Sequence, residues 1–160
     1  MSRRPAVVFG PDVYVNAFVG PDTDWAYLAG VLRAGANPDA DCLSIAFDAA
    51  GMRLMTSPRI LTAVEQTLHR LGVSTAHTQD ALDAVLEAVE ASGGAVVEPA
   101  RQVSDLPDRT HAMVMDLAVA VGAALVVTDD ADLTVLSPWR GIPVLRLRPL
   151  HHPGRTRPVR

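Results

Sequence analysis

Short apolar runs that stop at turn-forming or acidic residues alternate along the chain with segments of helical periodicity. Apolar positions at helical spacing between the runs predict helices, and this alternation favours a parallel sheet with helices packed on its faces. The predicted strands are Ala6–Phe9, Met52–Thr56, Ala95–Glu98, Leu125–Thr128 and Pro143–Leu147.

Polar and glycine residues at the edges of the helical segments predict where the helices begin and end. Ser, Thr and Asp are favoured as N-caps, and Gly is favoured just after a last helical turn. The region 21–51 is predicted to form one or two helices with a loop between them. The other predicted starts are Asp12, Ser57 followed by Pro58, Thr78, and either Asp108 or Thr110, and the predicted stops are Gly93 and Gly122.

The segment Leu125–Leu133 has the most specific pattern in the chain. Its apolar strand ends abruptly in a cluster of acids, Asp129, Asp130 and Asp132. Ligands of open α/β sheets bind in the crevice beyond the carboxyl ends of the strands. We therefore predict a functional site at the end of this strand, with Asp130 at its centre.

The succession of helix, Gly122, strand and acids, with the ending VT-x-D-x-DL, resembles the PIN domain family of metal-dependent nucleases. The resemblance implies a three-layer α/β/α domain with a mostly parallel four- or five-stranded sheet. It also implies that Ala6–Phe9 and Leu125–Thr128 are neighbours in that sheet. We expect a single PIN-like domain over residues 1–150 and a basic arm over 151–160. A response-regulator-like fold is the alternative, but it requires a Lys, and this chain has none.

In that family, a few carboxylates from distant segments hold Mg²⁺ or Mn²⁺ at the strand ends and cut single-stranded RNA. The resemblance places Asp130 on the last acidic position and Asp132 on the acidic position that often follows it. The other three usual acidic positions are occupied here by Gly10, Ala63 and His111. Whether the chain is an active enzyme therefore depends on what replaces those acids.

Two interpretations of these departures remain open. In the first, displaced acids restore the site, with Asp12 replacing the acid missing at Gly10 and Asp108 the one missing at His111. His111 then orients water, contacts phosphate or favours a softer ion such as Mn²⁺ or Zn²⁺. In the second, Asp12 and Asp108 are helix caps and His111 is a polar residue of the first helical turn.

Three further acids are not expected to hold the metal. Glu65 is close in sequence to Ala63, but at about 100° per residue the two side chains point roughly 200° apart around a helix. Glu65 is therefore expected to be a solvated flank of the site. Asp116 is expected to face solvent or a partner, and Asp129 to point away from the side that Asp130 faces.

Basic residues are concentrated at the end of the chain, where no acid follows Asp132. The net charge of -4 does not suggest a protein that binds nucleic acid through its overall charge. A local cationic strip can nevertheless contact phosphates, and Arg109 beside the predicted site is another candidate contact. The alternative for the strip is a solvated, mobile segment. Its candidate RNA contacts are Arg146, Arg148, Arg155, Arg157 and Arg160.

Composition restricts the remaining possibilities. Hydrophobic residues make up 49% of the chain and aromatic residues only 4%, which predicts an aliphatic core. The single cysteine, Cys42, excludes an internal disulfide and a thiolate zinc cluster. No apolar run reaches the roughly 18 residues of a membrane span, and the first residues do not form a signal peptide. We expect a cytoplasmic protein.

The resemblance implies a toxin-type endoribonuclease of a bacterial toxin–antitoxin pair, with RNA as substrate, an antitoxin as partner and a homodimer as assembly. The alternative function is a PIN-like module that has lost catalysis and binds RNA or a protein partner.

Overall fold

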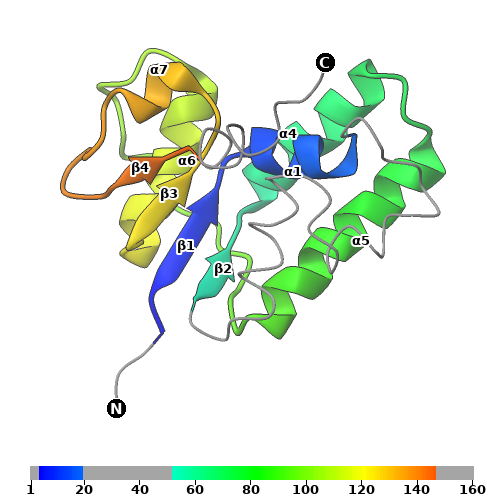
Figure 1. The fold of residues 1–160 in the computed structure, drawn as a ribbon, viewed down its shortest axis with the longest axis horizontal. Coiled ribbons are helices and arrows are strands. Elements are labelled where there is room, and N and C mark those ends of the chain that lie inside the picture. Colours follow the sequence, from blue (N-terminus) through cyan, green and yellow to red (C-terminus); the bar gives the residue numbers. More distant parts are fainter. Residues whose placement is uncertain (1–3, 20–51, 147–160) are drawn as a thin grey trace, which may run out of the picture.

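The sheet consists of four short parallel strands that come from distant parts of the sequence (Figure 1). The computed structural model describes residues 4–19 and 52–146. The strand order is β2-β1-β3-β4, and the central pair, β1 and β3, confirms the predicted neighbours. The strands are β1 (Ala6–Phe9), β2 (Arg53–Met55), β3 (Leu125–Val127) and β4 (Val144–Leu145).

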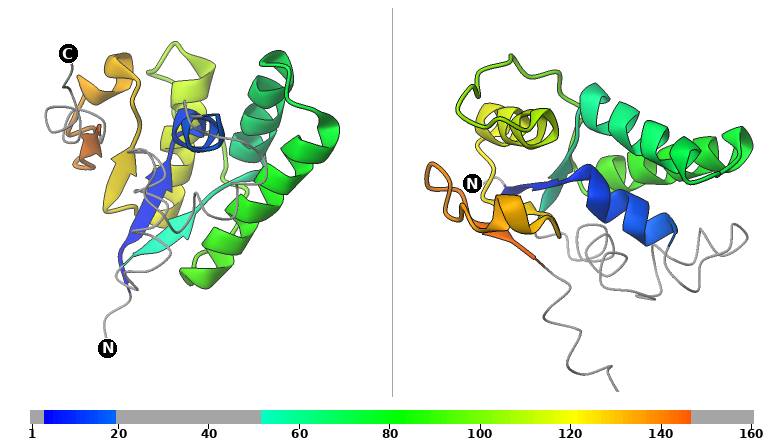
Figure 2. Two further views of the ribbon diagram at one scale, coloured as in Figure 1. Left: turned by 45° about the vertical axis from the view of Figure 1, so that its right-hand side comes forward. Right: turned by 90° about the horizontal axis from the view of Figure 1, so that it is seen from above.

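Helices cover both faces of the sheet. In Figure 2, right, α6 lies on one side of β1 and α1 on the other, which gives the three predicted layers. Helix α4 packs against α1, α5 and α6. The helices are α1 (Pro11–Phe18), α4 (Pro58–Arg70), α5 (Thr75–Ala91), α6 (Arg109–Val121) and the short α7 (Ala131–Thr134).

The central strand is apolar along its whole length because both of its faces are covered. Every residue of β1 is buried, and none is more than 2% exposed. The register pairs Val8 with Met55 on one side and with Val126 on the other. A strand with neighbours on both edges and helices on both faces cannot show the alternating pattern of a half-exposed strand.

Several predicted helix boundaries are confirmed by their caps. The Ser57 hydroxyl accepts a hydrogen bond from the Ile60 amide at 3.1 Å, and Pro58 is the first residue of α4. Asp108 is the N-cap of α6. Gly122 ends that helix with φ +61°, a left-handed conformation that favours glycine.

Other boundaries differ from the prediction. Helix α5 starts at Thr75, because the Ser74 hydroxyl caps it by accepting from the His77 amide at 3.1 Å. Helix α1 starts at Pro11 with Gly10 as N-cap, so Asp12 is not the cap. The predicted strand at 95–98 is reduced to a single bridge between Thr56 and Val96.

Helix α7 was not predicted, because it is a single short turn that follows directly from the acidic cluster. The predicted helices at 21–51 and the basic arm lie outside the described residues. No helix in the described segments is long and apolar enough to cross a membrane.

Candidate functional site

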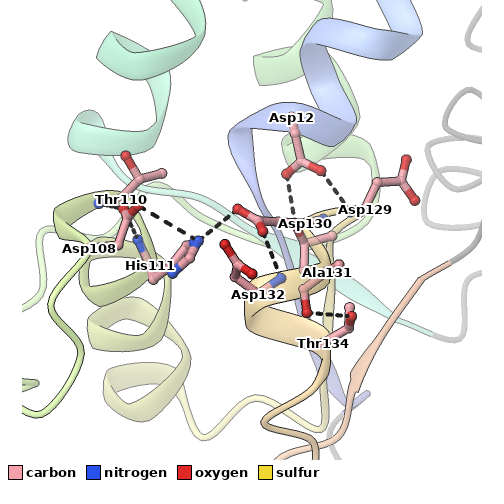
Figure 3. A network of polar contacts seen from close by, with 10 residues as sticks. Asp12, Asp108, Thr110, His111, Asp129, Asp130, Ala131, Asp132 and Thr134 are labelled. Atoms are coloured by element: carbon pink, nitrogen blue, oxygen red, sulfur yellow. Dashed lines mark hydrogen bonds and ion pairs between the residues drawn. The ribbon is translucent and has the colours of Figure 1, made fainter.

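Two carboxylates lie at the carboxyl ends of the central strands β1 and β3. Asp12, in the first turn of α1, crosses to the end of β3. Its Oδ1 accepts a hydrogen bond from the Thr128 hydroxyl at 2.9 Å, and its Oδ2 accepts one from the Asp129 amide at 2.7 Å (Figure 3). The same Thr128 oxygen accepts from the Asp130 amide at 3.1 Å. Thr128 thus joins the two acidic segments.

The Asp12 carboxylate fills the space beside Gly10. A Cβ atom at position 10 would lie 2.6 Å from Asp12 Oδ1 and 3.3 Å from the Thr128 hydroxyl oxygen. The backbone of Gly10, with φ −66° and ψ 159°, is ordinary extended backbone, so glycine is not needed there for its conformation. The side chain of any other residue at position 10 would displace the Asp12 carboxylate.

Burial makes the ionised form of the Asp12 carboxylate less favourable. Desolvation raises the pKa of Asp12 above its ordinary value, and hydrogen bonds from the Asp129 amide and the Thr128 hydroxyl partly offset this rise. The charge of Asp129 raises the pKa further. A carboxylate in this setting gains more from a nearby proton or cation than an exposed one does.

Asp130 faces α6 and pairs with His111. Asp130 Oδ2 lies 2.7 Å from His111 Nε2, while Asp130 Oδ1 accepts from the Asp132 amide at 2.9 Å and caps α7. The hydrogen bond with His111 is the main reason why the pKa of Asp130 is lowered. His111 is largely buried, at 9% exposure. Its side chain and that of Asp130 therefore hold each other in place.

Asp108 supports this pair from the N-terminus of α6. Its Oδ1 accepts from the amides of Thr110 at 2.8 Å and His111 at 3.2 Å, as a helix cap does. Its other oxygen lies 4.0 Å from His111 Nε2, too far for a hydrogen bond. The structure therefore gives Asp108 the predicted capping role.

Figure 3 shows how the remaining acids of the cluster lie. The Asp132 side chain, exposed in the first turn of α7, lies beside Asp130 and His111. The carboxylate of Asp129 points away from that of Asp130, as predicted.

Two adjoining cavities, of about 340 and 410 Å³, run along α4 next to this cluster. Both are lined by Ala63, Gln66 and Thr110, so they form one continuous hollow, which we call the α4 groove. The first cavity adds Arg59, Arg109 and Met113, and the second adds Asp12, Asn16 and Arg70.

Ala63 faces the α4 groove, whereas Glu65 lines neither cavity. Arg59, Gln66 and Arg70 also line the groove and were not predicted from the sequence. The available signal was their spacing with Ala63, which follows the turns of one helix face. Of the predicted arginines in the basic strip, Arg146 is exposed just after β4. Arg148, Arg155, Arg157 and Arg160 lie outside the described residues.

The prediction for Asp116 was wrong. Its side chain is buried rather than facing solvent or a partner, and the residue is 2% exposed. Asp116 Oδ1 accepts from the amides of Gln102 at 2.9 Å and Val103 at 2.8 Å, and Oδ2 pairs with Arg59 Nη1 at 3.3 Å. Asp116 fixes the loop that precedes α6 and takes no part in the acidic cluster.

The donor atoms of the cluster suit a hard divalent cation. Mg²⁺ in proteins usually keeps several waters and binds through one or two carboxylates together with substrate phosphates. Asp12 and Asp130 supply two such carboxylates at adjacent strand ends. In the described segments, however, no three His, Cys, Asp or Glu side chains are grouped as a metal site. The residues therefore fit a cation held partly by water and substrate, and do not form a complete protein cage.

Comparisons with known proteins agree with this architecture. The family model described as PIN domain matches residues 12–132. A similar solved structure is a domain of a functionally unknown protein from Methanocaldococcus jannaschii DSM 2661, with 11% sequence identity and a TM-score of 0.53. The match covers 89% of this chain and 91% of that chain, and at this identity it shows a shared fold alone. No curated protein matches the sequence.

Proposed function

Because the chain belongs to the PIN domain family of nuclease-like proteins, we propose that it is a Mg²⁺- or Mn²⁺-dependent endoribonuclease of the toxin type that cuts single-stranded RNA. The observation that carries this proposal is the position of the Asp12 carboxylate in the space beside Gly10. In this proposal Asp12, two residues later and tied through Thr128 to the end of β3, replaces the acid missing at position 10.

In this proposal Asp12 and Asp130 hold the ion, with Asp132 beside them. A bound Mg²⁺ or Mn²⁺ supplies activation of water and neutralises charge that develops on the phosphate. Thr128 orients Asp12 through its hydroxyl, and His111 orients Asp130 through Nε2. Asp108 holds His111 in place by capping α6. In the family an antitoxin and a second copy of the chain are common partners, and we propose both here, together with a cytoplasmic location.

A second function is favoured by a specific contact. His111 Nε2 is hydrogen-bonded to Asp130 Oδ2 at 2.7 Å, and each carboxylate oxygen of Asp12 already accepts a hydrogen bond. These internal partners satisfy much of the acidic cluster without a cation. The alternative function is therefore a catalytically impaired PIN-like module that binds RNA or a protein partner without cutting.

Calorimetric titration with Mg²⁺ and Mn²⁺, followed by cleavage of a single-stranded RNA, tests the proposal. We expect wild type to bind the ions and to cut, and Asp12→Asn and Asp130→Asn each to lower the cleavage rate by more than about 100-fold, because each removes a direct carboxylate donor. Asp80→Asn, an exposed position on α5, is the control and should cut like wild type. Absence of binding by either ion at millimolar concentration would leave the binding module as the function.

A further inference from the structure

The α4 groove is lined by more cationic than anionic side chains. Arg59, Arg70 and Arg109 line it, and Asp12 is its one acid among the described residues. The Arg59 guanidinium is already neutralised by acids of the chain, since it pairs with Asp116 at 3.3 Å and with Glu98 at 3.5 Å. In the described part of the chain, Arg70 and Arg109 form no ion pair with an acid. These two exposed guanidinium groups are thus available for an external anion.

The two arginines lie at opposite ends of the groove. Arg109 shares the first cavity with Pro58 and Arg59 at the start of α4, and Arg70 is the last residue of that helix. From Arg59 to Arg70 the rise along α4 is roughly 16 Å at about 1.5 Å per residue. This exceeds the approximately 3.4 Å that one stacked nucleotide occupies along a strand. Two contacts so far apart would fall on different phosphates of one strand.

The middle of the groove is polar but carries little opposing charge. Ala63 stands where the family has an acid, and the exposed amide of Gln66 offers both a donor and an acceptor. Both carboxylate oxygens of Asp12 accept internal hydrogen bonds, from the Thr128 hydroxyl and the Asp129 amide. A phosphate backbone in the groove would therefore meet only weak repulsion between its two cationic ends.

We propose that the α4 groove binds the phosphodiester backbone of single-stranded RNA directly through Arg70 and Arg109, without a divalent ion. The cavities of about 340 and 410 Å³ fall in the size range of ligand-binding pockets. The proposal is for one strand, so a duplex of the same sequence should bind more weakly. This inference rests on the proposed function only in taking RNA as the ligand.

Fluorescence anisotropy with a labelled oligouridylate in EDTA tests the inference. We expect wild type to bind in EDTA, with affinity that falls as salt rises. Arg70→Gln and Arg109→Gln should each weaken binding and reduce the slope of log affinity against log salt by about 0.7, the value for one lost contact with a single strand. The double variant should reduce the slope by about 1.4. Arg101→Gln, at an exposed arginine outside both cavities, is the matched control and should leave the slope unchanged.

The outcomes separate this inference from the proposed nuclease. Binding in EDTA that depends on Arg70 and Arg109, without cleavage in Mn²⁺, supports the groove and argues against the nuclease. Cleavage in Mn²⁺ with binding unaffected by either substitution supports the nuclease and overturns the groove. Loss of all binding in EDTA also overturns the groove, as does equal binding of the same sequence as a duplex. Displacement of the RNA by a polyglutamate peptide at equal charge concentration would show an acidic protein partner instead, and would overturn it as well.

Discussion

The Asp12 carboxylate occupies the space that a side chain at position 10 would need, at the end of β1. The observed Asp12 side chain reaches Thr128 and the Asp129 amide only because position 10 has no Cβ atom. The resemblance to the PIN family implies an acid at the position of Gly10, and this chain has an acid two residues later, at Asp12. Asp12 thus places a carboxylate beside the end of β3 although position 10 carries none.

This steric overlap predicts the effect of a small substitution. In Gly10→Ala the new Cβ lies 2.6 Å from Asp12 Oδ1 and must displace it, which breaks two hydrogen bonds. We expect Mn²⁺-dependent cleavage to fall by about 10- to 100-fold and the free energy of unfolding to fall by about 1 kcal/mol. Cleavage kinetics and urea unfolding measure the two effects.

A double variant that moves the acid from position 12 to position 10, which we call the exchanged pair, is the control for that prediction. The double variant Gly10→Asp with Asp12→Asn places the acid where the family has it and should cut at a rate near that of wild type. If Gly10→Ala cuts normally while the exchanged pair is inactive, the Asp12 carboxylate does not stand in for an acid at position 10.

At the level of elements, α4, α6 and the loop before α6 are held together by a partly buried ion pair. Arg59 of α4 donates to Asp116 of α6 and to the carbonyl oxygen of Pro99 at 2.6 Å, and Asp116 accepts from two loop amides. Arg59 and the Asp108 cap of α6 both stand close to the α4 groove. The ion pair therefore helps to fix the walls of the groove, which Arg59 itself lines.

Asp116→Asn should destabilise the fold without changing the chemistry. The partly buried Arg59 loses its closest counter-charge, and two loop amides lose a charged acceptor. We expect the free energy of unfolding to fall by about 2 kcal/mol in urea denaturation. Asp83→Asn, on the exposed face of α5, should change it by less than about 0.5 kcal/mol. Equal stability of the two variants would show that the ion pair contributes nothing.

Sequence patterns predicted the elements whose causes are local. The apolar run of β1, the Ser57–Pro58 start of α4 and the Gly122 stop of α6 each depend on neighbouring residues, and all three are confirmed. The segment 95–98 has a strand-like composition, but Thr56 offers it only one pairing position. Ser74 and Thr78 are both acceptable caps, and local rules did not choose between them.

Side-chain contacts between residues that are distant in the sequence could not be predicted from sequence patterns. The patterns indicated Asp12, Asp108, His111 and Asp130 as site candidates, and all four lie in one acidic cluster (Figure 3). Nothing in a helix's first turn indicates that His111 will reach a carboxylate at the end of β3. In the same way, the partner of Asp116 lies on another helix, so its burial had no local signal.

On the scale of the whole molecule, charge is unevenly distributed along the chain, because no acid follows Asp132. The acidic cluster ends at Asp132, and every charged residue after it is an arginine. RNA approaching the cluster meets repulsion from its carboxylates, which the arginines of the groove offset only locally. A basic segment elsewhere in the chain would increase the attraction at longer range, in a manner that depends on salt.

The arginines of the arm 151–160 lead to a further prediction, which is a proposal from the sequence. If Arg155, Arg157 and Arg160 contact phosphates, deletion of 151–160 should weaken RNA binding and flatten its salt dependence by about 0.7 per lost contact. The melting temperature should stay unchanged, because the arm supplies few apolar side chains. Replacing the three arginines by Gln in the full chain is the matched control and should reproduce the binding defect. Because the groove contacts are separate, Arg70→Gln should reduce the slope further in the truncated protein. A truncated protein that melts several degrees lower yet binds RNA as before would show that the arm stabilises the fold and leaves RNA binding to the groove.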